Sequence, residues 1–326
     1  MSRRSSMVKL AREYLAYRRG LGYALDMPGK YLLQFAKYLD RTKYRGPLTI
    51  ELALRWAQLP KGTALVYQAQ RLEAIRSFAK YRAIFDPATE VPPTGLLGPA
   101  HFRTTPHIYS EAELSVLLAA ARSLPPPRNS LLPGKELKPH TYVALFGLLA
   151  CTGLRISEAL KLNRSDVDWE QGVLTIRMTK FRKSRLVPMH PSTTKAMRRY
   201  AKLRDRFHPL PQTDAFFVTA QGRPLTYPSV EHTFIRYLRP QLSWSPQHGG
   251  RAPRIHDLRH TFACRRLLRW HEQGANIDHS IAALSTYLGH VEVSDTYWYL
   301  TGVPELFALV GARFERFAKS KPGDRS

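Results

Sequence analysis

The stretch Tyr287-Leu288-Gly289-His290-Val291-Glu292-Val293-Ser294-Asp295-Thr296-Tyr297-Trp298-Tyr299 decides how the C-terminal part of this chain is organised. It begins as the end of an apolar helix, and glycine, here Gly289, is the residue type that commonly ends one. His290 follows this stop at once, and Tyr299 lies nine residues further on. The stretch therefore places an imidazole and a phenol just beyond a helix end. These groups serve in proton transfer and nucleophilic attack.

Two arginines elsewhere in the chain can complete a site around these groups. In His256-Asp257-Leu258-Arg259, the histidine and the arginine stand at i and i+3, and so they share one helical face. Arg155 follows a long apolar run, and Gly153 is expected to end the helix of that run. Arg155 should then project from a junction between two helices. Guanidinium groups bind phosphate through paired donors and stay charged at any working pH.

The charge of the chain favours a polyanionic partner. The 326 residues include 50 Lys and Arg against 25 Asp and Glu, a net charge of +25. Residues 1–105 hold 18 of the basic and 7 of the acidic side chains, so the excess is spread over both parts of the chain. We therefore expect contacts with a phosphate backbone. A tyrosine that attacks a phosphodiester held by two arginines is the chemistry that these residues predict.

Cysteine count and hydropathy exclude several other classes of protein. Cys151 and Cys264 are the only cysteines, which excludes a disulfide framework and a cysteine-based zinc cluster, and both are expected to be small buried hydrophobes. The longest apolar run, 142–151, is shorter than the roughly 20 residues that cross a bilayer. No apolar signal core follows the N-terminal Ser2-Arg3-Arg4. We expect a cytoplasmic, nucleoid-associated protein without a membrane partner.

The N-terminal part is predicted to be a small helical bundle. Helices are expected within 7–84, the third of them introduced by Thr49 as N-cap. On the last helix the basic residues are expected to be exposed and to contact DNA: Arg71, Arg76 and Lys80. A proline- and glycine-rich segment follows. It divides the chain into a helical domain at 1–86, a linker at 87–109 and a second domain at 110–326.

The second domain is predicted to be mostly α with a small β-hairpin. Ser110-Glu111-Ala112-Glu113 has the form of a capping box. Residues 173–178 and 185–188 have strand composition, with the basic segment Lys180-Phe181-Arg182-Lys183-Ser184 as the hairpin loop. A further short strand is expected near 216–218. Helices are expected at 191–205, 227–239, 257–272, 279–288 and 304–317.

Four segments together make the chain resemble the tyrosine recombinase (phage integrase) family, which cuts and rejoins DNA through a covalent 3′-phosphotyrosine. They are TGLRISEAL at 152–160, TKFRKSRLVP at 179–188, HDLRHTFA at 256–263, and LGH at 288–290 with Tyr299. The resemblance covers about 110–299. It implies an integrase-type catalytic domain of the α+β class, and it makes the N-terminal bundle similar to the family's core-binding domain.

The resemblance also implies a role for each matching residue. Arg155 and Arg259 would hold the scissile phosphate. The spacing of Glu158, one turn after Arg155, makes it the expected ion-pair partner that orients Arg155, with a plain helix-surface pair as the alternative. Tyr299 would be the nucleophile, although first principles alone leave Tyr297 open. The remaining assignments from the resemblance are Lys180 as general acid, with Lys183 as its rival, and His256 and His290 as hydrogen-bond donors to the phosphate. The alternative for the loop follows from its charge: Lys180, Arg182, Lys183 and Arg185 would be DNA contacts of a basic segment.

No cofactor or metal is expected. The sequence has no GxxxxGK[ST] loop, and no third ligand stands at zinc spacing from the pair His256 and His260. The expected partner is double-stranded DNA with specific recombination sites, bound by a homotetramer that accessory recombinases could join. The expected function is the integrase or transposase of a mobile element. The alternatives are a chromosome dimer resolvase, a type IB topoisomerase-like enzyme, or a catalytically silent DNA-binding regulator.

Overall fold

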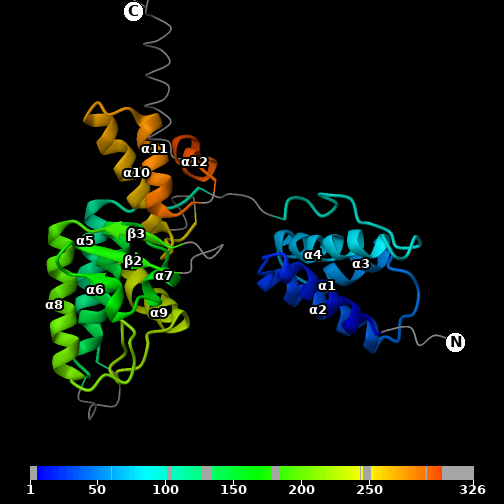
Figure 1. Ribbon diagram of the computed structural model, residues 1–326, viewed down its shortest axis with the longest axis horizontal. Coiled ribbons are helices and arrows are strands. Elements are labelled where there is room, and N and C mark those ends of the chain that lie inside the picture. Colours follow the sequence, from blue (N-terminus) through cyan, green and yellow to red (C-terminus); the bar gives the residue numbers. More distant parts are fainter. Residues whose placement is uncertain are drawn as a thin grey trace, which may run out of the picture. The chain divides into compact units, whose positions relative to one another are not determined.

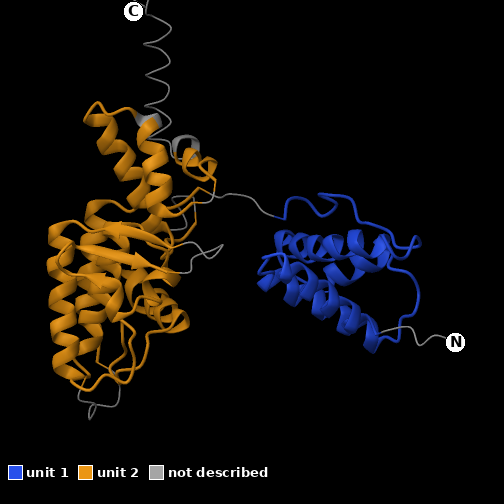
Figure 2. Cartoon of the chain, viewed as in Figure 1, with its two compact units in different colours: residues 1–104 blue, residues 105–326 orange. Residues whose placement is uncertain are grey.

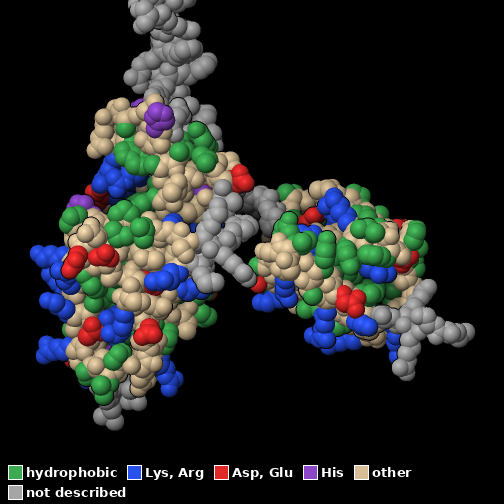
Figure 3. Space-filling view, viewed as in Figure 1, with side chains coloured by type: hydrophobic (Ala, Val, Ile, Leu, Met, Phe, Trp, Pro, Cys, Tyr) green, Lys and Arg blue, Asp and Glu red, His purple; other side chains and the backbone are tan. Residues whose placement is uncertain are grey.

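The chain forms two compact units in the computed structural model, residues 1–104 and residues 105–326 (Figure 2). The structure describes residues 6–59, 61–100, 105–126, 134–177, 184–242, 244, 251–290 and 292–302. Lys180, Arg182 and Lys183 lie outside the described residues, as does the predicted helix at 304–317. Figure 3 shows Lys and Arg side chains on the visible face of both units.

The first unit is a helical bundle, as predicted (Figure 1). Its helices are α1 (Met7–Gly20), α2 (Asp26–Arg41), α3 (Ile50–Gln58) and α4 (Leu65–Ala83). Thr49 caps α3 by accepting a hydrogen bond from the backbone N–H of Leu52. Aromatic side chains from different helices meet in the core, where Phe35 packs edge-on against Trp56 with 5.3 Å between ring centroids.

The first part of the predicted linker packs on this bundle. The backbone N–H of Glu90 donates to the carbonyl of Leu48 at 2.8 Å, and Arg76 Nε donates to the carbonyl of Pro92 at 3.0 Å. Thr89 is buried. Prolines remove backbone donors but leave carbonyl acceptors, so an irregular segment can still bind a helix. The division between the units therefore falls at 104/105, within the predicted linker of 87–109 and later than its start.

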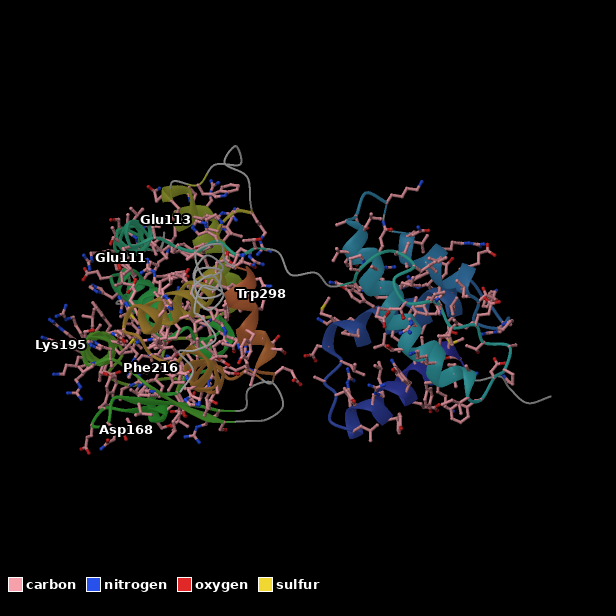
Figure 4. The ribbon with its side chains drawn as sticks, turned by 90° about the horizontal axis from the view of Figure 1, so that it is seen from above. Glu111, Glu113, Asp168, Lys195, Phe216 and Trp298 are labelled. Carbon is pink, nitrogen blue, oxygen red and sulfur yellow. The ribbon has the colours of Figure 1, made fainter. Side chains whose placement is uncertain are left out.

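The second unit is mostly α with a small sheet, which confirms the predicted fold class. Its helices are α5 (Glu111–Arg122), α6 (Leu137–Thr152), α7 (Ile156–Leu160), α8 (Pro191–Phe207), α9 (Tyr227–Thr233), α10 (Asp257–Glu272), α11 (Ile277–Leu288) and α12 (Ser294–Gly302). The predicted capping box of Ser110 and Glu113 begins α5. Apolar α6 contacts α5, α8 and α10, and it is buried along most of its length. In Figure 4, Lys195 projects outward from α8 whereas Phe216 lies within the unit.

The strands of the described residues form an antiparallel sheet in the order β1-β2-β3. They are β1 (Val167–Asp168), β2 (Val173–Ile176) and β3 (Arg185–Pro188). The predicted hairpin is present, with Leu174 opposite Val187 and Ile176 opposite Arg185. Two-residue β1 was not predicted because so short a strand has no readable alternation.

Three other expectations need correction. Residues 216–218 form no strand. Val218 makes an isolated bridge with Pro224, as Ala215 does with Asn163, and Phe216 and Phe217 between them fill the core. The helix expected at 227–239 ends as an α-helix at Thr233 and continues as a π-helical turn, Phe234–Leu238. Cys151 is exposed, and only Cys264 is buried as expected. Within the described ranges, no helix combines the length and the hydropathy needed to cross a membrane.

Candidate active site

Two glycine turns and the first turn of α10 form the base of the candidate site. Gly153 ends α6 with φ +62°, and Gly289 follows α11 with φ +71°. Arg259, only 2% exposed, joins these turns: Nη1 donates to the carbonyl of Gly153 and Nη2 to the carbonyl of Leu288, each at 2.9 Å. A buried guanidinium thus fixes two segments that lie more than 100 residues apart in the sequence.

Arg155 lies at the predicted junction, as the N-cap residue of α7. Its Nη2 donates to the carbonyl of Gly289 at 3.3 Å, next along the chain from the carbonyl that Arg259 binds. The two arginines therefore meet at one turn. Burial, and then the charge of Arg155, lowers the pKa of Arg259 to about 10. Arg259 still carries its charge at neutral pH, and the pair forms a cationic centre.

Glu158 is held by two arginines instead of one. The expected ion pair with Arg155 forms, with Nη1 2.9 Å from Glu158 Oε1. Arg185, predicted to contact DNA, instead donates from Nη1 and Nη2 to the two Glu158 oxygens at 3.0 and 2.9 Å. Burial alone would raise the pKa of Glu158. The hydrogen bonds and charges of Arg185, and then of Arg155, lower it to about 2.

Tyr299 lies on α12 and is almost fully buried, with 2% of its surface exposed. Burial raises the pKa of this phenol to about 12. The Arg259 guanidinium opposes this shift through its charge and a side-chain hydrogen bond, and the charge of Arg155 opposes it as well. Tyr297 is 43% exposed. Of the two tyrosines that first principles left open, Tyr299 is therefore the one buried beside Arg259.

Two histidines pack against the Tyr299 ring, and a third packs against one of them. His290 lies nearly parallel to it at 6.2 Å between centroids, and His290 Nδ1 is hydrogen-bonded to Thr296 Oγ1 at 2.7 Å. The His260 ring stands edge-on to Tyr299 at 5.5 Å and to His256 at 4.9 Å. Trp298, also edge-on to His260 and labelled in Figure 4, packs beside them.

Two of these imidazoles are held neutral. Burial, followed by the charge of Arg259, lowers the pKa of His256 to about 4, although this residue keeps an exposed surface. Burial and then His256 lower the pKa of His260 to about 3. A neutral imidazole offers one donor and one acceptor, so each can donate to a phosphate oxygen or accept a proton.

The predicted DNA contacts on α4 divide into different environments. Arg71 was expected to be exposed, which is wrong: it is buried, its Nη2 donates to the carbonyl of Trp56 at 2.9 Å, and its guanidinium lies 3.6 Å from the centroid of that indole. Arg76 is half-buried and bonded to Pro92 and Glu73. Lys80 is exposed as predicted. Helical periodicity predicts that Arg71 is exposed because it takes no account of an aromatic partner on another helix. Here an indole of α3 buries the guanidinium.

Sequence reasoning missed two residues of the site. Arg185 was assigned to DNA because it follows a basic loop, and its pairing with Glu158 leaves no local signal. His260 was considered only as a metal ligand with His256. Among the residues that the structure describes, no cluster of three His, Cys, Asp or Glu side chains could hold a metal ion. His260 directly follows Arg259, and this position was the signal that could have placed it at the site.

Comparison with known proteins adds independent findings. Residues 113–303 match the phage integrase family. The integrase/recombinase y4rB of Sinorhizobium fredii is 42% identical over 96% of this chain and 98% of its own length. The tyrosine recombinase XerC of Chlamydia caviae is 32% identical over 71% of this chain and 65% of its own length. The solved structure of the Tn1549 transposon integrase with transposon right end DNA has a TM-score of 0.64 at 18% identity, covering 96% of this chain and 100% of that one. At this identity the structural likeness concerns the fold.

Proposed function

Because this chain belongs to the phage integrase family of tyrosine site-specific recombinases, we propose that it cleaves and rejoins DNA through a covalent bond between Tyr299 and a 3′-phosphate. One observation carries this proposal: the buried phenol of Tyr299 faces Arg259, and Arg259 and Arg155 bind successive carbonyls of one turn. A phosphate beside Tyr299 would meet both cations.

In the proposed step, the Tyr299 oxygen attacks the scissile phosphorus and loses its proton. The bond from phosphorus to the 5′ oxygen breaks, and that oxygen takes a proton to become a hydroxyl. Arg155 and Arg259 stabilise the charge that grows on the non-bridging oxygens, because their positions are fixed before the reaction. His256, which is held neutral, and His290 donate hydrogen bonds to the phosphate and assist proton transfer. Attack by a 5′ hydroxyl of another strand reverses the step and restores the phosphodiester.

A nicked suicide DNA substrate tests this proposal. Cleavage next to the nick releases a short fragment that carries the new 5′ hydroxyl, and its loss prevents religation and traps the covalent complex. The DNA that flanks the gene supplies the candidate sites. Wild type should give a complex that survives denaturing electrophoresis, and Tyr299→Phe should give none. Tyr297→Phe is the matched control and should react normally. A covalent complex formed by Tyr299→Phe, or a wild type that only shifts DNA in a salt-sensitive way, would contradict the proposal and favour a silent DNA-binding regulator.

Lys180 is proposed as the general acid for the departing 5′ oxygen. Its place a few residues before β3, in the segment 179–188 that resembles the family's hairpin, supports this role. A 5′-phosphorothiolate has a leaving group that needs no proton. It should therefore restore cleavage by Lys180→Ala and leave a Lys183→Ala protein unaffected. Rescue of the Lys183 variant instead would assign the acid to Lys183.

The biological role is proposed as that of a mobile-element integrase or transposase, acting on double-stranded DNA as a homotetramer. The 42% identity to an integrase/recombinase over nearly the full chain supports it. Resolution of chromosome dimers, which would use the same chemistry, is the second candidate. A plasmid with two candidate sites distinguishes the two: excision and reinsertion of a marked segment support the first, and resolution of plasmid dimers alone supports the second. Light scattering with and without DNA tests the tetramer.

A further inference from the structure

Arg185 begins β3 and is committed to bonds within the protein. Its Nε donates to the carbonyl of Tyr287 at 2.8 Å, and Nη1 and Nη2 each donate to a Glu158 oxygen. The side chain is only 11% exposed. A phosphate-binding arginine at the base of a hairpin would keep its fork open to solvent. The paired geometry of Arg185 is instead directed at a carboxylate.

The carboxylate that Arg185 binds is the same one that holds Arg155. Glu158 Oε1 accepts from Nη1 of both arginines, at 2.9 and 3.0 Å. Oε2 accepts from the backbone N–H of Arg155 and from Arg185 Nη2, both at 2.9 Å. Each oxygen therefore joins the two arginines. A shift of Arg185 would displace the Glu158 carboxylate, and Arg155 would lose the partner that fixes its fork.

Arg185 also contacts the turn that precedes His290. A Cβ added at Gly289 would lie 2.8 Å from Arg185 Nη1, so the guanidinium occupies the space that a side chain there would need. The carbonyl of Gly289 in turn accepts from Arg155 Nη2. One side chain on β3 thus touches both structures that place Arg155: the Glu158 carboxylate and the Gly289 turn.

We propose that Arg185 is a positioning residue of the cleavage reaction, which through Glu158 and the Gly289 turn fixes the guanidinium of Arg155 against the scissile phosphate. This inference rests on the proposed function. If Arg185 has this role, the position of β3 affects how the phosphate is held for attack. In the sequence β3 follows the segment that contains Lys180. Misplacement of a catalytic group by about 1 Å can cost roughly 100-fold in rate.

The test compares cleavage rates at saturating DNA for Arg185→Gln and Arg177→Gln. Arg177 follows β2 at the other base of the hairpin, is 59% exposed and pairs with Asp166, so its removal costs the same charge near the same loop. We expect Arg185→Gln to cleave about 10- to 100-fold more slowly than wild type. Arg177→Gln should stay within about threefold, since Arg177 is bonded to Asp166 and not to a group that holds Arg155. Arg185→Lys should not restore the rate, because an ammonium lacks the fork.

A substrate with a methylphosphonate at the scissile position separates positioning from a general loss of folding. The methyl group replaces a charged oxygen, so the reaction depends less on Arg155. The rate deficit of Arg185→Gln should then shrink at least about tenfold, whereas a folding defect would slow both substrates alike.

The outcomes are distinguishable. Failure of wild type to form a covalent complex contradicts the proposed function itself. If wild type reacts and Arg185→Gln matches Arg177→Gln, or is equally impaired on both substrates, the inference is wrong. A normal rate with weaker DNA binding, and a salt slope reduced by about one, would instead make Arg185 a phosphate contact.

Discussion

Replacing Glu158 with glutamine should destabilise the second unit, and the structure allows the size of the effect to be estimated. The substitution keeps the volume but removes the charge that Arg155 and Arg185 share. Two estimates agree. The pKa of Glu158 is lowered from 4.5 to about 2, which corresponds to roughly 3 kcal/mol of stability at neutral pH. Removing one partner of a buried ion pair costs about 3–5 kcal/mol.

Urea unfolding followed by tryptophan fluorescence measures this loss. Four of the five tryptophans lie in the second unit, so the signal reports chiefly on it; they are Trp169, Trp244, Trp270 and Trp298. At pH 7.5 we expect Glu158→Gln to lower the free energy of unfolding by about 3 kcal/mol. Glu170→Gln is the control. Glu170 is exposed in the same unit, and its replacement should change the stability by less than about 0.5 kcal/mol.

The pH dependence gives a second check whose sign is fixed. Because the folded-state pKa of Glu158 lies below the unfolded one, its stabilisation is fully present above about pH 4.5 and is lost as the pH falls towards 2. The difference between wild type and Glu158→Gln should therefore be constant from pH 7.5 to about 5 and shrink below that. A loss below about 1 kcal/mol at pH 7.5, or a difference that persists unchanged at pH 3.5, would refute the reasoning.

Three further results are expected. Arg71→Gln should lower the stability of the first unit by about 1–3 kcal/mol, since its guanidinium is buried against an indole. It should leave the salt dependence of DNA binding unchanged, whereas replacing exposed Lys80 with glutamine should reduce the slope of that dependence by about one. The reverse pattern would contradict the assignment. Gly153→Ala should cost about 2–4 kcal/mol in urea unfolding, because φ is +62° and a Cβ would lie 2.5 Å from Phe262, and a neutral result would show that the turn can relax. His260 is held neutral with a pKa of about 3, so between about pH 6.5 and pH 3 only the unfolded state binds a proton at this residue. The stability of wild type should therefore decrease as the pH is lowered through that range. The stability of His260→Gln should depend less on pH.

Much of the fold could be predicted because its signals are local. The capping box at Ser110, the helix-ending glycines and the hairpin strands depend on residues within a few positions of one another, where propensity and hydrogen bonding act directly. The placement of Arg155 at a helix junction followed from Gly153 in the same way. Residues 216–218 show the limit. Their apolar run fits a strand or any buried segment, and only the absence of a partner strand among the described residues decides between them.

The sequence by itself determined which chemical groups this protein can bring to a phosphodiester, because those groups stand in short motifs with fixed spacing. The tertiary structure decided which of them meet. It buried Tyr299 and exposed Tyr297, placed Arg71 against Trp56, and turned Arg185 from the loop to Glu158. The two arginine contacts join residues that are distant in the sequence. The two tyrosines are neighbours in the sequence, and only packing decides which of them is buried. Their free energies depend on packing and desolvation, which no local pattern of residues encodes.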